Sequence, residues 1–337
     1  MLPITPATLA EARRFNRLLS LLPRFTIRKH WTPRLIQSLL RLSQTGADFK
    51  MRRAGLTIDT IDTPVPIRIL RPAGQVRAVI LDYHGGGWAI GNPQLNDQRN
   101  AALIDACQVA VVSVDYRLAP ATALEDMLAD CLAAARWLLE GGLREYVDLP
   151  VIIIGESAGA HLAAATLLEL KRWPDLLAKV SGAVLYYGVY DLVGSPSAHA
   201  AGSDTLVLDG PDLVSALARL TPHLSDAERR LPPLSPLYGE LAGLPPALLI
   251  GGALDPLIDD TRLLAARWAA VAPVELHVLP EAPHGFIRFP TAMAKLTQDW
   301  VHSWINALIE KPAAYAAPGS GAASLTRPGL TPASPSA

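Results

Sequence analysis

Six short and almost uninterrupted apolar runs recur along the chain, and most of them are followed by residues with helical spacing. The runs are "AVILDY", "VAVVSVDY", "VIIIGES", "GAVLYYG", "ALLIGG" and "VELHVLP". Strands that are apolar on both faces and alternate with helices are typical of a mainly parallel sheet covered on two sides. The sequence therefore predicts an α/β fold, with helices at 122–140, 158–171, 260–271 and 292–309.

Two further strands are expected before these runs. "LTIDTI" and "VPIRIL" alternate between apolar and polar residues, as antiparallel strands do, and a turn at 62–64 separates them. Together with the six runs they predict a sheet of eight strands. In folds of this class the reactive loops lie at the carboxyl ends of the parallel strands, so the residues just after each run are candidates for chemistry.

Three segments fall outside the strand–helix alternation. Residues 1–50 contain two amphipathic helical stretches, and residues 189–235 form an insertion rich in turn formers with two modest helical stretches. We expect these two segments to form a helical cap over a core that spans 51–310. Residues 311–337 lack periodicity and are dense in Pro, Gly, Ala and Ser, which predicts a flexible tail.

Composition and charge narrow the expected partners and location. Half of the 337 residues are apolar, enough for a large core, and the net charge of −1 gives no electrostatic reason to expect nucleic acid or an anionic membrane. No stretch reaches the roughly eighteen apolar residues of a membrane span, and the N-terminus lacks a signal-peptide pattern. We expect a cytoplasmic protein with free buried thiols at Cys107 and Cys131, and leave homodimer formation open.

A serine stands where one buried strand must become a helix. Residues 155–159, "GESAG", fit the G-x-S-x-G pattern of a nucleophile elbow. Such a turn strains the serine backbone, and the flanking glycines lack side chains that would collide with the neighbouring strand and helix. The same pattern is also compatible with a purely structural role, in which the serine is simply a small polar residue that favours a turn. The strand–turn–helix setting favours Ser157 as a nucleophile.

A glycine run ends an earlier strand, in "LDYHGGGW". A serine nucleophile needs hydrogen-bond donors aimed at the oxygen that becomes negative, and glycines let backbone N–H groups approach a ligand unhindered. A loose turn or a phosphate-binding loop is the alternative, but no Gly-Lys-Ser/Thr follows the glycines. The run therefore predicts an oxyanion hole.

An acid and a base follow in the expected chain order of serine, acid and histidine. Asp255 and His284 each come just after an apolar strand, on the face where Ser157 is expected. Asp259 and Asp260 are rivals, although a capping role in the first turn of the next helix suffices for them. Six further histidines are expected to be structural or weak candidates: His30, His161, His199, His223, His277 and His302. No spacing of Cys and His residues predicts a metal site.

Five ordered motifs resemble those of the bacterial hormone-sensitive-lipase-like (family IV) serine esterases of the α/β-hydrolase fold. They are "HGGGW" at 84–88, "DYRLAP" at 115–120, "GESAG" at 155–159, "DPL" at 255–257 and "HGF" at 284–286. The resemblance also implies a helical cap. One departure is the short stretch 121–123, where relatives usually have a glutamate and a proline-bearing loop.

The resemblance implies a role for each motif residue. Ser157 would be the nucleophile, His284 the general base and then acid, and Asp255 its orienter. The oxyanion hole would come from the N–H groups of Gly86, Gly87 and Ala158. His84 would anchor the glycine loop, and Glu156 would stand at a supporting position where many relatives have aspartate.

The function expected from these residues is that of a cofactor-independent serine carboxylesterase acting on a small-molecule ester of short to medium acyl length. Trp88 and Leu206 are expected to bind substrate, with Val207 and Leu208 in the same apolar part of the cap. The triad does not discriminate this function from that of an amidase or carbamate hydrolase. A non-catalytic receptor on the same fold is disfavoured, because all three triad positions are filled.

Overall fold

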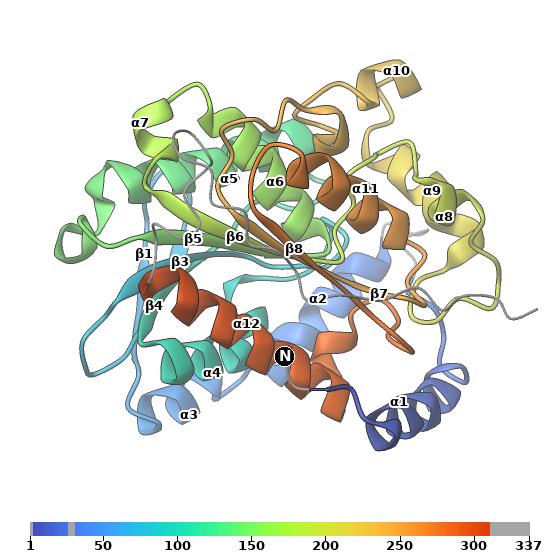
Figure 1. The fold of residues 1–337 in the computed structure, drawn as a ribbon, viewed down its shortest axis with the longest axis horizontal. Helices are drawn as coiled ribbons and strands as arrows, with labels where there is room; N and C mark the ends of the chain where they lie inside the picture. Colours follow the sequence, from blue (N-terminus) through green and yellow to red (C-terminus); the bar gives the residue numbers. More distant parts are fainter. Residues whose placement is uncertain (1–2, 26–30, 311–337) are drawn as a thin grey trace, which may run out of the picture.

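An eight-stranded sheet forms the centre of the protein, with helices on both faces (Figure 1). The computed structural model describes residues 3–25 and 31–310, so the tail predicted at 311–337 and His30 lie outside the described residues. The strand order is β1-β2-β4-β3-β5-β6-β7-β8. Strands β3 to β8 run parallel, whereas β2 pairs antiparallel with β1 and β4. The fold predicted from the sequence is confirmed.

Each apolar run of the sequence coincides with or overlaps one of the parallel strands, and the antiparallel pair precedes them. The strands are β1 (Thr57–Ile61), β2 (Ile67–Arg71), β3 (Ala78–Tyr83), β4 (Val109–Val114), β5 (Val151–Glu156), β6 (Val180–Tyr186), β7 (Ala247–Gly252) and β8 (Val274–Leu279). The main helices of the core are α4 (Asp97–Cys107), α5 (Leu124–Trp137), α6 (Ala158–Leu170), α7 (Pro174–Leu177), α11 (Ile258–Ala269) and α12 (Ala292–Glu310). The four core helices predicted by position all begin within two residues of the expected start.

The two faces of the sheet pack against different helices, which explains the unbroken apolar runs. In β5, Ile152 and Ile154 belong to the cluster that contains α4 and α12, whereas Val151 and Ile153 belong to the cluster that contains α5, α6 and α11. Successive side chains of a strand point to opposite faces, so a strand that is covered twice must be apolar at every position. Both cysteines lie in these clusters as free, buried thiols.

The segments outside the core are helical. The N-terminal segment contains α1 (Pro6–Leu19), α2 (Trp31–Ser43) and α3 (Ala47–Arg53), and the insertion contains α8 (Pro196–His199), α9 (Gly210–Leu220) and α10 (Asp226–Arg229). A short parallel bridge joins the two segments: Phe25 donates to Val207 O at 2.6 Å, and Asp209 donates to Phe25 O at 3.2 Å. No helix in the described part of the chain has the length and apolarity needed to span a bilayer.

Two acidic residues attach the start of the insertion to the core. Asp260 in α11 accepts the backbone N–H groups of Tyr190 and Asp191, and Asp259 accepts that of Ser197. Burial raises the pKa of Asp260 to about 7. The N-terminus of α11 has no side-chain cap, so the capping role expected from the sequence is wrong: both carboxylates bind backbone N–H groups of the insertion instead.

Candidate active site

Ser157 occupies the sharp turn between β5 and α6, with backbone angles φ 54 and ψ −117. Positive φ is rare for residues other than glycine and costs about 1–3 kcal/mol. A Cβ on Gly155 would lie 2.3 Å from Gly159 O, and one on Gly159 would lie 2.0 Å from Tyr83 O. The two glycines are therefore required by the close approach of helix α6 and strand β3, for the steric reason that the sequence suggested.

The three residues proposed as a triad come together at the carboxyl ends of their strands. Ser157 Oγ lies 2.9 Å from His284 Nε2, and His284 Nδ1 lies 2.8 Å from Asp255 Oδ2. The second carboxylate oxygen of Asp255 accepts the N–H of Leu257 at 2.9 Å. Asp255 is fully buried, and its carboxylate can hold the imidazole with Nδ1 protonated and Nε2 free to take the serine proton.

The glycine loop after β3 lies beside Ser157. Gly86 and Gly87 adopt φ values of 122 and 59, and both line the same cavity as the serine. A Cβ on Gly86 would lie 2.0 Å from Ile90 O. Within residues 3–25 and 31–310, the N–H groups of Gly86, Gly87 and Ala158 have no acceptor. Unpaired amides beside a serine hydroxyl are the kind of donor that could bind an oxyanion.

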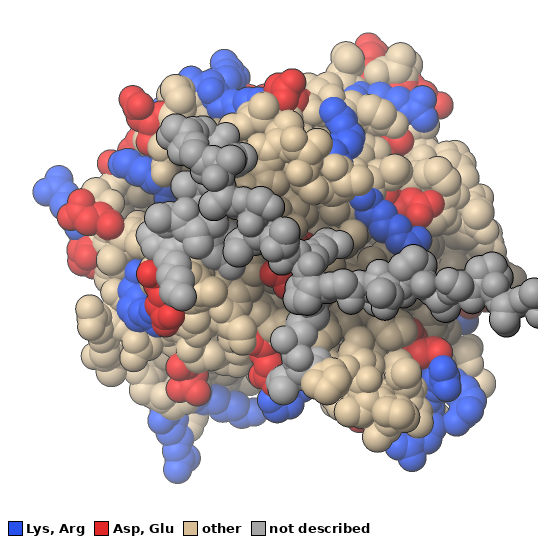
Figure 2. All heavy atoms as spheres, viewed as in Figure 1, with Lys and Arg blue, Asp and Glu red and all other residues tan. Residues whose placement is uncertain are grey.

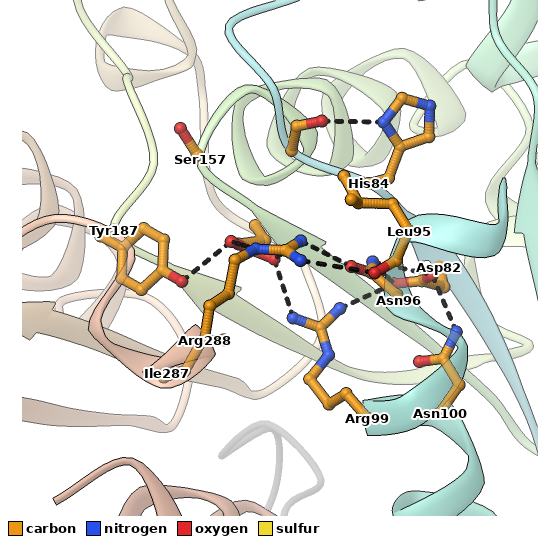
Figure 3. Close-up of polar contacts among 12 residues, drawn as sticks. Asp82, His84, Leu95, Asn96, Arg99, Asn100, Ser157, Tyr187, Ile287 and Arg288 are labelled. Atoms are coloured by element: carbon orange, nitrogen blue, oxygen red, sulfur yellow. Dashed lines mark hydrogen bonds and ion pairs between the residues drawn. The ribbon is translucent and has the colours of Figure 1, made fainter. Parts of the chain in front are cut away.

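His84 braces this loop from below. Its ring stacks on Tyr116, with centroids 4.3 Å apart, and its Nδ1 lies 2.8 Å from Gly85 O (Figure 3). Burial lowers the pKa of His84 to about 4, so the ring is neutral and its Nδ1–H donates to Gly85 O. Tyr116 O–H donates to His84 O at 2.6 Å. These contacts support the anchoring role that the family resemblance implies.

A second histidine holds the other end of the glycine loop. Trp88 Nε1 donates to Nδ1 of His161 at 3.2 Å, and Nε2 of His161 lies 2.7 Å from Leu234 O. Burial lowers the pKa of His161 to about 4, which keeps the ring neutral with its proton on Nε2. The chain Trp88–His161–Leu234 thus joins the loop, helix α6 and the end of the insertion. Its partners are far apart in the sequence, so no local pattern indicated it.

A buried ionic network lies under Ser157 (Figure 3). Glu156, the residue before Ser157, accepts hydrogen bonds from Arg99 Nη1 at 3.0 Å, Arg288 Nε at 2.6 Å and Tyr187 O–H at 3.0 Å. Burial alone would raise the pKa of Glu156, but the two guanidinium groups and the hydroxyl lower it to about 2. Arg99 also contacts Asp82, whose carboxylate accepts from Asn96, Asn100 and Ser113.

The cavity above Ser157 has a volume of about 790 Å³ and mainly apolar walls. Trp88 lines it, as expected, together with the short stretch 119–123 and much of α9. Leu206 is not among the lining residues, whereas Val207 and Leu208 are. The expectation for Leu206 is wrong by one residue, because the bridge to Phe25 begins at Val207, whose φ of 69 turns the backbone there. The conformation of Val207 depends on this contact with a distant segment, so the local sequence could not predict it.

Three further histidines have partners in the described part of the chain. His277 contacts Glu275 at 2.7 Å and stacks on Trp300, and His199 contacts Val193 O at 3.0 Å. His223 lines the far wall of the cavity and contacts Glu125 at 2.8 Å. Among the residues that the structure describes, no group of His, Cys, Asp and Glu could hold a metal ion.

Known proteins resemble this chain over most of its core. A family model for the alpha/beta hydrolase fold matches residues 80–288. An acetyl-hydrolase from Streptomyces hygroscopicus is 35% identical over 217 residues, which cover 64% of this chain and 70% of the relative. The structure of the esterase LipW from Mycobacterium marinum shares 25% identity with a TM-score of 0.77 and covers 90% of this chain and 98% of its own. A hormone-sensitive lipase from a metagenome library shares 28% identity with a TM-score of 0.71, covering 88% and 98%.

Proposed function

Since this chain belongs to the α/β-hydrolase fold family, we propose that it hydrolyses short- to medium-chain acyl esters through a covalent acyl-enzyme on Ser157. It is a carboxylic ester hydrolase of the hormone-sensitive-lipase-like group, like the esterases to which it is similar. The observation that carries the proposal is the pair of contacts that His284 makes, 2.9 Å to Ser157 Oγ and 2.8 Å to Asp255 Oδ2.

These contacts support a two-step acyl transfer. His284 Nε2 takes the proton as Ser157 Oγ attacks the ester carbonyl, while Asp255 stabilises the imidazolium that forms. The N–H groups of Gly86, Gly87 and Ala158 bind the oxyanion. The alcohol leaves with the proton from His284, and a water molecule, activated in the same way, releases the carboxylic acid and restores the serine.

The apolar walls of the cavity support an acyl substrate. Its walls near α9 are formed by Leu213, Leu217 and Leu220, and the short stretch 119–123 forms another part of the boundary. Burying each methylene of a substrate contributes about 0.8 kcal/mol, so the specificity constant for p-nitrophenyl esters should rise from acetate as the chain lengthens and fall once the cavity is full. A series from acetate to palmitate, measured at equal monomeric concentrations, locates the maximum.

The decisive experiment is the removal of the nucleophile. Ser157→Ala should lower kcat for p-nitrophenyl butyrate by about four orders of magnitude or more and abolish labelling by a fluorophosphonate probe. Ser303→Ala is a matched control, because this hydroxyl donates only to Asp299 O on the exposed side of α12. Turnover that survives in Ser157→Ala would overturn the proposal.

Amides and carbamates pass through the same oxyanion, so the choice of ester is tested directly. Matched butyryl ester and anilide substrates should differ by several orders of magnitude in kcat/KM in favour of the ester. A preference for the anilide would make the protein an amidase with the same triad. We also propose a cytoplasmic location, which the free buried thiols Cys107 and Cys131 support.

A further inference from the structure

The basic residues of the chain are concentrated at its N-terminus. Residues 1–55 contain eleven lysines and arginines and two acidic residues, whereas the whole chain contains 30 and 31. The rest of the protein is therefore acidic, and the overall net charge of −1 conceals a strongly basic segment. The absence of an electrostatic reason for contact with an anionic membrane, inferred from that net charge, does not hold for the N-terminal helices.

The two acidic residues of this segment are engaged in contacts with the core. Glu11 accepts the N–H of Ala292, and Asp48 binds the guanidinium of Arg68 at 2.6 Å. Arg13 also contacts the core, through an ion pair with Glu281. The segment still presents exposed basic side chains on each of its helices: Arg14 and Arg17 on α1, Arg41 on α2, and Lys50 and Arg53 on α3.

Exposed apolar side chains are concentrated in the same segment. Of the thirteen large apolar residues that are exposed in the described part of the chain, six lie between residues 18 and 49. Three of them lie at the end of α1 and in the turn that follows it: Leu18, Leu21 and Leu22, with exposed fractions of 63%, 81% and 58%. The other three are on α2 and α3: Leu39, Leu42 and Phe49.

Leu18 shares one face of α1 with two arginines, Arg14 and Arg17. Ala12 and Leu19 are buried against the protein, and the helical period places Arg14, Arg17 and Leu18 on the opposite side. Figure 2 shows blue side chains beside an uncharged surface over α1, at the lower right. An amphipathic helix that exposes both leucine and arginine is suited to a bilayer surface, where the cations meet lipid phosphates and the leucines enter the acyl boundary.

We propose that the N-terminal helices, led by this face of α1, bind reversibly to the surface of an anionic lipid bilayer. The position of Phe25 connects this bilayer contact to the candidate active site. Phe25 comes three residues after Leu22 and lines the cavity above Ser157, held there by its bridge to the insertion. Assuming the proposed esterase function, the docked enzyme takes esters that partition into the bilayer, because the chain that enters the lipid leads directly to the cavity wall.

The test measures lipid binding without turnover. The full-length protein is sedimented with phosphatidylcholine vesicles that contain either no phosphatidylglycerol or 30 mol% of it. We expect binding only to the anionic vesicles, weakened about tenfold or more in 0.5 M NaCl because surface charges are then screened. Ser157→Ala should bind as the unmodified protein does, so failure of the esterase proposal does not affect this measurement.

Two variants address the face itself. Leu18→Ser/Leu21→Ser/Leu22→Ser and Arg14→Glu/Arg17→Glu should each weaken vesicle binding at least tenfold, while their turnover of soluble p-nitrophenyl acetate is unchanged. Matched controls from the rest of the surface are Leu231→Ser, which removes an exposed leucine, and Arg144→Glu, which removes an exposed arginine. Both controls should bind vesicles normally.

Three results would overturn the proposal. The first is no binding to anionic vesicles at low salt, and the second is equal binding by the α1 variants and the controls. The third is a dimer in gel filtration that the triple leucine variant dissociates, with no lipid binding by the unmodified protein. That result would make the leucines a subunit interface.

Discussion

Arg288 donates to Glu156 at 2.6 Å, and this contact connects the two loops on which catalysis is proposed to depend. Arg288 comes four residues after His284, and Glu156 immediately precedes Ser157. The segments that carry Ser157 and His284 therefore share a buried ionic support, which Figure 3 shows beside Ser157. The two side chains are also joined by their own hydrogen bond. Arg99 holds the other side of the same carboxylate.

Removing Arg288 should loosen the alignment of the two loops. For Arg288→Gln we expect kcat/KM for p-nitrophenyl butyrate to fall about 10- to 100-fold, because small misplacements of reacting groups have large effects on rate. Glu156→Gln/Arg288→Gln should recover part of the loss, since it no longer buries an undercompensated carboxylate, and the double-mutant cycle should give a coupling of about 1–3 kcal/mol. Additive effects of the two single changes would contradict a shared role.

Stability in acid should depend on Glu156. The pKa of this carboxyl is about 2 in the folded protein against an ordinary value of 4.5. The carboxylate therefore contributes its full stabilisation above pH 4.5 and loses it as the pH falls from 4.5 toward 2. By linkage this amounts to about 3 kcal/mol. Urea unfolding between pH 2.5 and 7 should show a shallower decline of the unfolding free energy in Glu156→Gln; parallel curves would rule the contribution out.

Gly86 should tolerate no side chain. Its φ of 122 is unfavourable for other residues, and a Cβ would collide with Ile90 O, so Gly86→Ala must move the loop that carries the proposed oxyanion donors. Loss of one such donor lowers kcat by about 10²–10³. Gly243→Ala is the matched control: φ there is also positive, at 81, but no atom lies within 4 Å. It should reduce stability slightly and leave the steady-state kinetics of ester hydrolysis unchanged.

His161 should be replaceable only by a residue that both accepts and donates a hydrogen bond. His161→Leu leaves the indole N–H of Trp88 and the carbonyl of Leu234 buried without partners, at a cost of about 1–3 kcal/mol for each group. We expect a lower melting temperature and a fall in kcat of about tenfold or more from displacement of the glycine loop. His161→Gln should restore part of both. Equal kinetics for the leucine and glutamine variants would mean that the contact does not position the loop.

Local patterns in the sequence predicted the strands, the elbow and the order of the reactive residues. The apolar runs around Ile153 and Leu249 identify strands without reference to the rest of the chain, because burial on two faces demands apolar side chains at every position. Ser157 could be singled out because its neighbouring glycines mark a turn. Asp255 and His284 followed from their places just after strands, which put them at the same edge of the sheet.

The partners of Glu156 could not be predicted in this way. Arg99 and Arg288 are separated from it by 57 and 132 residues, on α4 and on the loop before α12. Other arginines of the chain form exposed ion pairs. No feature of the neighbouring sequence distinguishes Arg99 and Arg288 from them. The contact of Trp88 with His161 and the inward position of Val207 in place of Leu206 depend in the same way on elements packed from distant parts of the chain.

The division follows from the range of the forces involved. Periodicity, turn chemistry and the order of motifs are properties of neighbouring residues. The sequence alone therefore determined the α/β sheet and was enough to select Ser157, Asp255 and His284 as candidates. Three features depend on which segments meet in space: the hydrogen-bond partners, the surface left uncovered on α1, and the contacts and burial that shift the pKa values of Glu156 and His161. Only the tertiary structure decided those, because a buried charge or an exposed leucine is defined by what packs against it.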